Sequence, residues 1–347
     1  MVVSTLHQIV DDFPPVDHAF GYGSGVFHQP DLYDQSPAPT GNAPAISSDS
    51  PQLDFIFGVQ DPQQWHTENL ARHRSHYSLM GMLGPSAVTA VAERLGVGIY
   101  FNTLVPWGNH RIKYGVISLA ALERDLQQWD TLYCAGRLHK PVMALREHPA
   151  VLAAQARNLL SALRVALLLL PDQFTTEEML HTISALSYSG DLRMGVAEDA
   201  KKVQRIVQGS NAGLRDLYRV PLSTAEADWQ VVQRQGASAA DSWVQDRSVN
   251  AQAGLVSALP QTLLRCMARS AGLPHSNEQL QRLEGPWEVA AALLKPGQPQ
   301  PLRWHVRHAV SQVVRASSHR QLVAGFLSAG VTKSVRYAFS KLKKAWR

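Results

Sequence analysis

Phe20-Gly-Tyr-Gly-Ser-Gly25 and Leu53-Asp-Phe-Ile-Phe-Gly-Val59 are the two stretches of sequence that decide the fold. The second is a compact apolar run of strand-forming residues with one acid, Asp54, inside it. The first is a glycine-rich turn, in which Gly23, Ser24 and Gly25 offer backbone N–H groups and a hydroxyl at close approach. If the turn opens a helix, the helix dipole adds an attraction for negative charge.

Such a turn beside a strand carboxylate suits a nucleotide site. The turn can hold a triphosphate, and an acid on a neighbouring strand can hold Mg²⁺ against the phosphates. Polymerase-beta-like nucleotidyltransferases work in this way. Taken alone, the pattern is equally met by a flexible turn followed by a strand whose aspartate has no special role.

The chain changes character near residue 148. Before it, strands are predicted at 97–104 and 111–118 and a helix at 119–134. After Pro149 the pattern is helical, and Thr175-Thr-Glu-Glu178 is a capping box that opens a helix through Leu186. The apolar run from Leu159 to Leu170 contains Arg164 and is too short to span a bilayer, so a core helix is predicted there.

Charge is distributed unevenly along the 347 residues, whose net charge is +5. Residues 1–71 contain nine Asp or Glu and no Lys or Arg, whereas residues 289–347 contain eleven Lys or Arg and no acid. The basic end calls for an anionic partner or surface. The acidic end suits a metal-dependent site, or is only solvated.

The last residues predict a basic amphipathic helix. Val331, Val335, Phe339 and Leu342 recur at helical spacing, and cations surround them. This composition is typical of a segment lying on an anionic membrane surface. A terminal helix docked on its own domain is the alternative, and no nucleic-acid-binding motif accompanies the charge. The residues predicted to contact the membrane are Lys333, Arg336, Lys341, Lys343, Lys344 and Trp346.

The cysteines and the first residues of the chain bear on the cellular compartment. Cys134 and Cys266 make no disulfide framework, and no motif that activates a thiol surrounds either, which indicates a reducing interior. The first residues include Asp11 and Asp12 and no basic residue. We therefore expect neither a secretory signal nor a basic presequence.

Two further groups of polar residues are candidates for binding phosphate. Lys113 lies mid-strand in an apolar run, so a phosphate partner would explain it; a lysine at a sheet edge is the alternative. Arg137 and Lys140 can point the same way at a phosphate, or face solvent. The second group lies in a turn and is either an anion cradle or a helix cap: Tyr188, Ser189, Asp191 and Arg193. His66, His73 and His76 lack a clean zinc-ligand spacing, so zinc is not expected.

Several ordered motifs resemble the mitochondrial phosphatidate cytidylyltransferase family, also called the mitochondrial translocator assembly and maintenance proteins. The likeness runs from about residue 16 to the C-terminus and is poorest at 28–52 and 222–300. The motifs that carry it, besides the two quoted first, are Ser75-His-Tyr-Ser78, Lys113-Tyr-Gly-Val-Ile-Ser118, Tyr133-Cys-Ala-Gly-Arg-Leu-His-Lys140, Ser187-Tyr-Ser-Gly-Asp-Leu-Arg-Met194 and Arg315-Ala-Ser-Ser-His-Arg320.

The resemblance implies an α/β (α+β) fold in three parts. A polymerase-beta-like nucleotidyltransferase domain with a mixed sheet would occupy residues 1–148. A mainly helical, winged-helix-like domain would follow at 149–300, and the basic membrane-associating segment would occupy 301–347. The implied activity is the Mg²⁺-dependent transfer of CMP from CTP to phosphatidic acid, supplying cardiolipin synthesis. The implied location is the matrix side of the inner mitochondrial membrane, bound peripherally.

On this basis Gly23, Ser24 and Gly25 are assigned to the CTP phosphates and Asp54 to Mg²⁺. No general base is expected, because the attacking phosphate is already anionic. The superfamily pattern wants a second acid where Ile56 stands, so the second metal ligand stays open among Asp61, Glu68 and Asp125. Two other functions also stay open: nucleotidyl transfer to a soluble acceptor, and a non-catalytic role in assembling a mitochondrial translocase.

Overall fold

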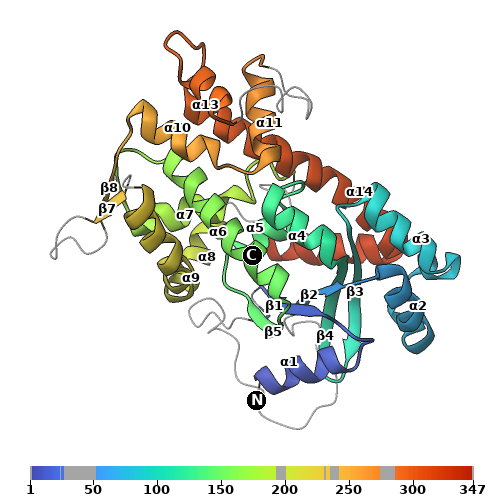
Figure 1. Ribbon diagram of the computed structural model, residues 1–347. Coiled ribbons are helices and arrows are strands. Elements are labelled where there is room, and N and C mark those ends of the chain that lie inside the picture. The colour runs from blue at the N-terminus through green and yellow to red at the C-terminus, as the bar shows by residue number, and fades with distance from the viewer. Residues whose placement is uncertain are drawn as a thin grey trace.

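A computed structural model of the protein describes residues 2–23, 25–26, 52–192, 201–229, 232–234, 242–273 and 286–345. Of 329–345 it describes the helical backbone only. The structure contains a five-stranded mixed sheet among many helices (Figure 1).

The five-stranded sheet has the order β3-β4-β2-β1-β5. The pairing of β2 with β4 is parallel, and the other pairings are antiparallel. In this strand order, β2 and β4 are both inner strands. The predicted strands at 53–59, 97–104 and 111–118 are confirmed. The bounds are β1 His18–Tyr22, β2 Leu53–Val59, β3 Ile99–Trp107, β4 His110–Ser118 and β5 Met143–Arg146.

Alternation along β2 sends its side chains into two cores. Phe55 and Phe57 pack with residues of α1 (Val2–Asp11) and α2 (Pro62–Arg72). Ile56, on the opposite face, joins the larger core with α4 (Leu119–Gln128) and α6 (Pro149–Leu169). Asp54 is two residues from Ile56 and so belongs to the face that α4 and α6 cover.

The residues after α6 form a second, smaller unit around a three-stranded antiparallel sheet, β6-β8-β7. After α6 the described elements follow in the order strand, three helices and a pair of strands, and the winged-helix-like character of this part stays a prediction. The capping box at Thr175 is present in full: its hydroxyl accepts from the Glu178 N–H, and the Glu178 carboxylate accepts from the Thr175 N–H. The bounds are β6 Gln173–Thr175, α7 Thr176–Leu186, α8 Lys202–Gly209, α9 Asn211–Thr224, β7 Val232–Arg234 and β8 Ser242–Gln245.

α6 begins at Pro149, where the helical pattern was predicted to begin, and continues through the apolar run to Leu169. Among the described residues it is the one helix long and apolar enough to cross a membrane by length and composition. However, 61% of its most apolar window is buried inside the protein. We therefore assign α6 to the core, as predicted.

α14 (Leu302–Ala345) is a single helix of 44 residues. Val306, Val310 and Val313 are buried in the larger core. Farther along, Ala324 is buried against the smaller cluster that contains Tyr77 and Tyr100. Figure 1 shows the helix passing from α11 (Gln261–Ser270) toward α3 (Pro85–Ala90), so it ties the two sheet-containing parts together. The amphipathic C-terminal segment is thus the end of a helix whose first half is core.

The helix predicted at 119–134 is wrong in one respect: it is two helices, α4 and α5 (Tyr133–Leu138). Trp129 and Leu132, between them, have φ angles of 56° and 53°, in the left-handed region where an α-helix cannot continue. The chain therefore reverses locally before α5 begins. One larger core contains residues from Phe20 to Val314 and crosses both predicted boundaries, which themselves stay predictions.

Candidate functional site

Three polar or charged side chains lie in register across the sheet: Tyr22 on β1, Asp54 on β2 and Lys113 on β4. Residues paired in register point to the same face of a sheet, here the face that α4 and α6 cover. We call these three residues the site row. Lys113 is on an inner strand, which removes the edge-lysine alternative, and its Nζ lies 4.5 Å from the centroid of the Phe101 ring.

The glycine-rich turn follows directly after Tyr22. Gly23 has a φ angle of 81°, which a residue with a side chain rarely adopts. A Cβ atom at Gly23 would lie 3.7 Å from Asp54 Oδ2, so the turn and the carboxylate are neighbours. Gly25 lies against the Gln52 carbonyl. Ser24 and residues 27–51 lie outside the described part, so the hydroxyl and a helix after the turn stay predictions.

Arg137 faces the site row from α5. Its guanidinium carbon lies 4.6 Å from the ring centroids of both Tyr22 and Tyr133, and its Nη2 donates to the Tyr133 hydroxyl at 2.8 Å. Two buried polar atoms here, Arg137 Nε and the Tyr22 hydroxyl oxygen, have no hydrogen-bond partner in the described part of the chain. A buried donor without a partner is costly unless a ligand completes it. The place therefore suits an anion.

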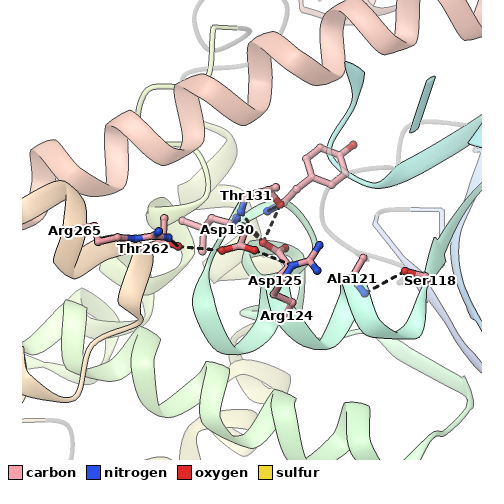
Figure 2. Close-up of polar contacts among 10 residues, drawn as sticks. Ser118, Ala121, Arg124, Asp125, Asp130, Thr131, Thr262 and Arg265 are labelled. Carbon is pink, nitrogen blue, oxygen red and sulfur yellow. Dashed lines mark hydrogen bonds and ion pairs between the residues drawn. The ribbon is translucent and has the colours of Figure 1, made fainter. Parts of the chain in front are cut away.

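Asp125 fixes the position of α5. Its Oδ1 accepts from the N–H groups of Thr131 and Leu132 and from the Thr131 hydroxyl, at 2.8 to 2.9 Å. Its Oδ2 accepts from the N–H groups of Cys134 and Ala135. Figure 2 shows the Asp125 carboxylate directed toward Thr131; Asp130, which contacts Arg124 and Thr262, lies nearby. The buried carboxylate thus caps the start of α5, one turn before Arg137.

Lys140 is directed to the turn that follows α7. Its Nζ donates to the Ser187 hydroxyl at 2.8 Å and lies 5.0 Å from the Tyr188 ring centroid. Lys202, from the first turn of α8, lies 5.2 Å from the same ring. Burial, helped by Arg137 and Lys202, lowers the pKa of Lys140 to about 7. Burial is thus the main cause of the lowered pKa and the two cations add to it, whereas an anion bound beside the amine would oppose it.

The remaining residues of this turn attach it to α14 and to the end of α7. Asp191 accepts a hydrogen bond from the Ser318 hydroxyl at 2.8 Å, and the Ser189 hydroxyl donates to the Ala185 carbonyl. Gly190 has a φ angle of 86°, and a Cβ there would lie 2.7 Å from the Ser311 carbonyl oxygen. These three contacts set where Tyr188 lies. Arg193 lies outside the described residues, so its role stays a prediction.

One carboxylate of the site, that of Asp54, could hold a divalent cation. Asp54 Oδ1 accepts from the Gln52 side-chain amide at 2.8 Å, which leaves Oδ2 on the Gly23 side. The described residues hold no cluster of three or more His, Cys, Asp or Glu that could bind a metal unaided. One carboxylate beside a glycine-rich turn is compatible with Mg²⁺, which often takes its other ligands from substrate phosphates and water.

The three candidates for a second metal ligand are occupied otherwise. Both oxygens of Asp125 accept hydrogen bonds from α5, as described above. Asp61 is the N-cap of α2 and accepts from the N–H groups of Gln63 and Gln64. Glu68 is paired with Arg72 one turn along α2. Helix capping and ion pairing therefore account for these three acids in the described structure.

Two of the three histidines, His66 and His76, belong to a hydrogen-bonded network on the face of the sheet opposite the site row. His66 Nδ1 lies 2.7 Å from the Tyr77 hydroxyl, and His76 Nδ1 lies 3.0 Å from the Tyr114 hydroxyl. Asn69 donates to both of these hydroxyls. Burial lowers the pKa of His66 to about 3, so it is neutral and serves packing.

Sequence reasoning missed four contributors: Tyr22, Phe101 and Tyr133, whose rings hold the cations, and Lys202. Tyr22 and Tyr133 stand inside motifs quoted for the family, and Phe101 stands in the strand predicted at 97–104, but only the fold shows which cation each ring contacts. Lys202 had no signal of its own. Burial raises the pKa of Tyr22 to about 12, while Arg137 and Lys113 oppose the rise.

The predicted membrane residues are only partly described. Lys333, Arg336, Lys341, Lys343 and Lys344 fall within α14, of which only the backbone is described there. Trp346 lies outside the described residues. The helical conformation that the amphipathic spacing requires is confirmed up to Ala345, and contact with a membrane stays a prediction.

Comparison with known proteins gives one consistent result. The family described as "Phosphatidate cytidylyltransferase, mitochondrial" matches residues 6–344. A Danio rerio protein of that name is 38% identical over 343 residues, covering 98% of this chain and 94% of that protein. Relatives of the same name from Drosophila melanogaster and Schizosaccharomyces pombe are 36% and 34% identical, and the alignments cover 95% and 98% of this chain and 95% and 83% of those proteins.

Proposed function

The chain belongs to the mitochondrial phosphatidate cytidylyltransferase family, and we propose that it transfers CMP from CTP to phosphatidic acid. The products are CDP-diacylglycerol and pyrophosphate. The observation that carries the assignment to this site is the site row with its surroundings. One carboxylate and a glycine turn stand on the sheet, and Arg137 and Lys140 approach from α5 and the residues that follow it.

The reaction joins two anions. A phosphate oxygen of phosphatidic acid attacks the α-phosphorus of CTP, and the bond from that phosphorus to the pyrophosphate oxygen breaks. The attacking oxygen carries its negative charge already, so no side chain has to remove a proton. What the protein must supply is alignment of the two phosphates and compensation of their charge.

The side chains that could bind the two phosphates lie in two places. The Gly23 turn and Lys113 lie beside Asp54, where the triphosphate would bind. The second place is the turn after α7, which α14 holds through Ser318; Lys140, Lys202 and Tyr188 lie together there. Arg137 stands next to Tyr22 of the site row and lowers the pKa of Lys140, so it links the two groups. We assign the second group to the phosphate of phosphatidic acid.

Asp54 would hold Mg²⁺ through Oδ2, and the cation, when bound, neutralises phosphate charge as the pyrophosphate leaves. The rest of the positioning falls to the chain. Arg137 is fixed between two aromatic rings and cannot follow a misplaced phosphate. An immobile guanidinium of this kind favours one alignment of the two substrates.

The relatives are named as mitochondrial proteins. We extend this to a peripheral position on the matrix side of the inner membrane, where the product would feed cardiolipin synthesis. The basic end of α14 supports such a position, because an anionic membrane surface attracts a cationic helix and also contains the lipid substrate.

The test is a reaction with purified full-length protein, labelled CTP and vesicles that contain phosphatidic acid, with and without Mg²⁺. We expect labelled CDP-diacylglycerol in the lipid phase and pyrophosphate in the aqueous phase, both dependent on Mg²⁺. Transfer of label to a water-soluble phosphate but not to the lipid would favour the soluble-acceptor function. No transfer to either acceptor would favour the non-catalytic function.

A further inference from the structure

Large apolar side chains are exposed where α14 meets the helical turns after α2. Leu79, Met82 and Leu83 lie on a short 3-10 helix, η3 (Leu79–Leu83), and are 75%, 71% and 69% exposed. On α14, Phe326 is 58% exposed, and three other apolar residues nearby are 42 to 46% exposed. The full set, which we call the apolar patch, is Leu79, Met82, Leu83, Leu95, Leu322, Val323, Phe326 and Leu327.

The two parts of the apolar patch are held against each other. The Ser78 hydroxyl, at the start of η3, donates to the Ser328 carbonyl of α14. Ala324 is buried among Tyr77, Val88 and Val91, and a Cβ at Gly96 would lie 3.2 Å from its methyl group. The exposed residues of η3 and α14 therefore stand on elements that are packed against each other. Apolar groups gathered in this way on a folded protein mark a contact surface.

Along α14, the apolar patch lies between the contact with the turn that we assign to phosphatidic acid and the cationic end of the helix. Ser318 holds Asp191 of the turn at 187–191, which we call the site turn. Residues 322–327 follow Ser318 within about 6 to 14 Å along the helix, at 1.5 Å per residue. Beyond the patch, residues 333–347 contain six Lys or Arg and no acid. The order along one helix is thus site turn, apolar residues, cations.

We propose that the apolar patch enters the hydrocarbon of an anionic bilayer and so places the membrane beside the site turn. The cationic end of α14 would attract the protein to the surface, and the apolar patch would hold it there at one orientation. A bilayer is favoured over a protein partner because apolar residues followed by cations on one helix match acyl chains beneath anionic headgroups. This inference rests on the proposed function only in taking the lipid at the site turn to be the substrate.

The experiment separates the contribution of the apolar patch to vesicle binding from the contribution of the cations. The full-length protein is floated with vesicles of phosphatidylcholine and phosphatidic acid, at low salt and at about 1 M salt, where charges are screened beyond about 3 Å. The patch variant replaces Leu79, Met82 and Leu83 by serine, and a second variant carries Leu322→Ser and Phe326→Ser. The matched control carries Leu152→Ser and Val220→Ser, which are also exposed and lie on α6 and α9.

We expect both patch variants to partition at least about tenfold less at high salt, with the control unchanged. All three variants should keep their circular dichroism and their turnover of short-chain phosphatidic acid dissolved as monomers. Partition within about twofold of the wild type at high salt in both variants overturns the proposal. So does sedimentation showing a wild-type dimer that the substitutions dissociate, because a second copy would then cover the patch.

The same assays distinguish this proposal from the proposed function. If the wild-type protein does not convert soluble phosphatidic acid, the assignment of activity fails while flotation still tests the patch. If turnover is normal and flotation is unchanged in the variants, the patch proposal alone fails.

Discussion

Asp54 is the residue on which the catalytic assignment depends most, because it stands between Tyr22 and Lys113 and beside the Gly23 turn. Asp54→Asn keeps the shape and the hydrogen bond from Gln52 but removes the charge that would hold Mg²⁺. We expect kcat to fall by about 100-fold or more, since the compensation of phosphate charge is lost. The far-ultraviolet circular dichroism and vesicle binding should stay as in the wild type.

Asp61→Asn is the matched control for Asp54→Asn. Asparagine caps a helix about as well as aspartate, so the N-cap of α2 is preserved while the charge is removed. Kinetic constants should stay within about threefold of wild type. If Asp61→Asn were as inactive as Asp54→Asn, Asp61 would return as a metal ligand; an active Asp54→Asn would remove Asp54 from that role.

As a proposed phosphate ligand, Lys140 should make phosphate binding sensitive to pH. Its pKa in the free protein is lowered to about 7 by burial and by Arg137 and Lys202, so it loses its proton as the pH rises through that value. The neutral amine attracts phosphate less, and kcat/KM reports the free enzyme. We therefore expect kcat/KM to decline on the alkaline side of about pH 7. In Lys140→Arg, which stays charged, this decline should be absent.

The pH profile of kcat/KM for phosphatidic acid tests this prediction directly, with the exposed Lys295→Arg as control. The control should titrate like the wild type. Identical profiles for all three proteins would show that Lys140 does not set the alkaline limb.

At the scale of elements, α5 is placed by one carboxylate. Asp125→Ala would leave the N–H groups of Thr131, Leu132, Cys134 and Ala135 without their acceptor. We expect the free energy of unfolding to fall by about 3 kcal/mol, as for buried donors left unsatisfied. KM should rise as well, because Arg137 and Lys140 would no longer be held toward the site.

Urea unfolding of Asp125→Ala measures this loss, with Asp130→Ala as the comparison. Asp130 makes an ion pair with Arg124 and a hydrogen bond with Thr262 at the surface (Figure 2), so its removal should cost less than about 1 kcal/mol. Unchanged stability of Asp125→Ala, together with a raised Mg²⁺ requirement, would contradict the capping role.

At the scale of the whole molecule, α14 contains core residues, Ser318 that holds the site turn, and the cationic end that we propose binds a membrane. Removing residues 330–347 deletes six cations and leaves Val306, Val313 and Ala324 in their cores. We expect the truncated protein to fold and to bind CTP. It should lose most low-salt flotation and most activity on vesicles, and keep turnover of short-chain phosphatidic acid.

Truncation and the patch variants should affect different parts of vesicle binding. Truncation should reduce the salt-sensitive part, and substitution of Leu79, Met82 and Leu83 the salt-resistant part. Normal flotation of the truncated protein at low salt would assign the end of α14 to a structural role. Flotation with sucrose gradients at the two salt concentrations gives both readings.

Local sequence determined those features whose cause is local. The apolar run at Leu53–Val59 forms a strand because its residues favour one, and the Thr175–Glu178 capping box opens α7 because both of its hydrogen bonds close within one turn. The ordered motifs likewise identified the family, since each can be read without knowing its partners. The candidate nucleotide residues Gly23 and Asp54 came from the same local reading.

Only the tertiary structure decided which side chains meet. The register of β1, β2 and β4 makes a row of Tyr22, Asp54 and Lys113, although up to about ninety residues separate them in the chain. Asp125 could not be told from a metal ligand by sequence, because the N–H groups that occupy it become available only when the chain reverses between α4 and α5. The first half of α14 is core for the same reason: its partners on α6, α11 and β3 lie far away in sequence, and burial depends on all of them together.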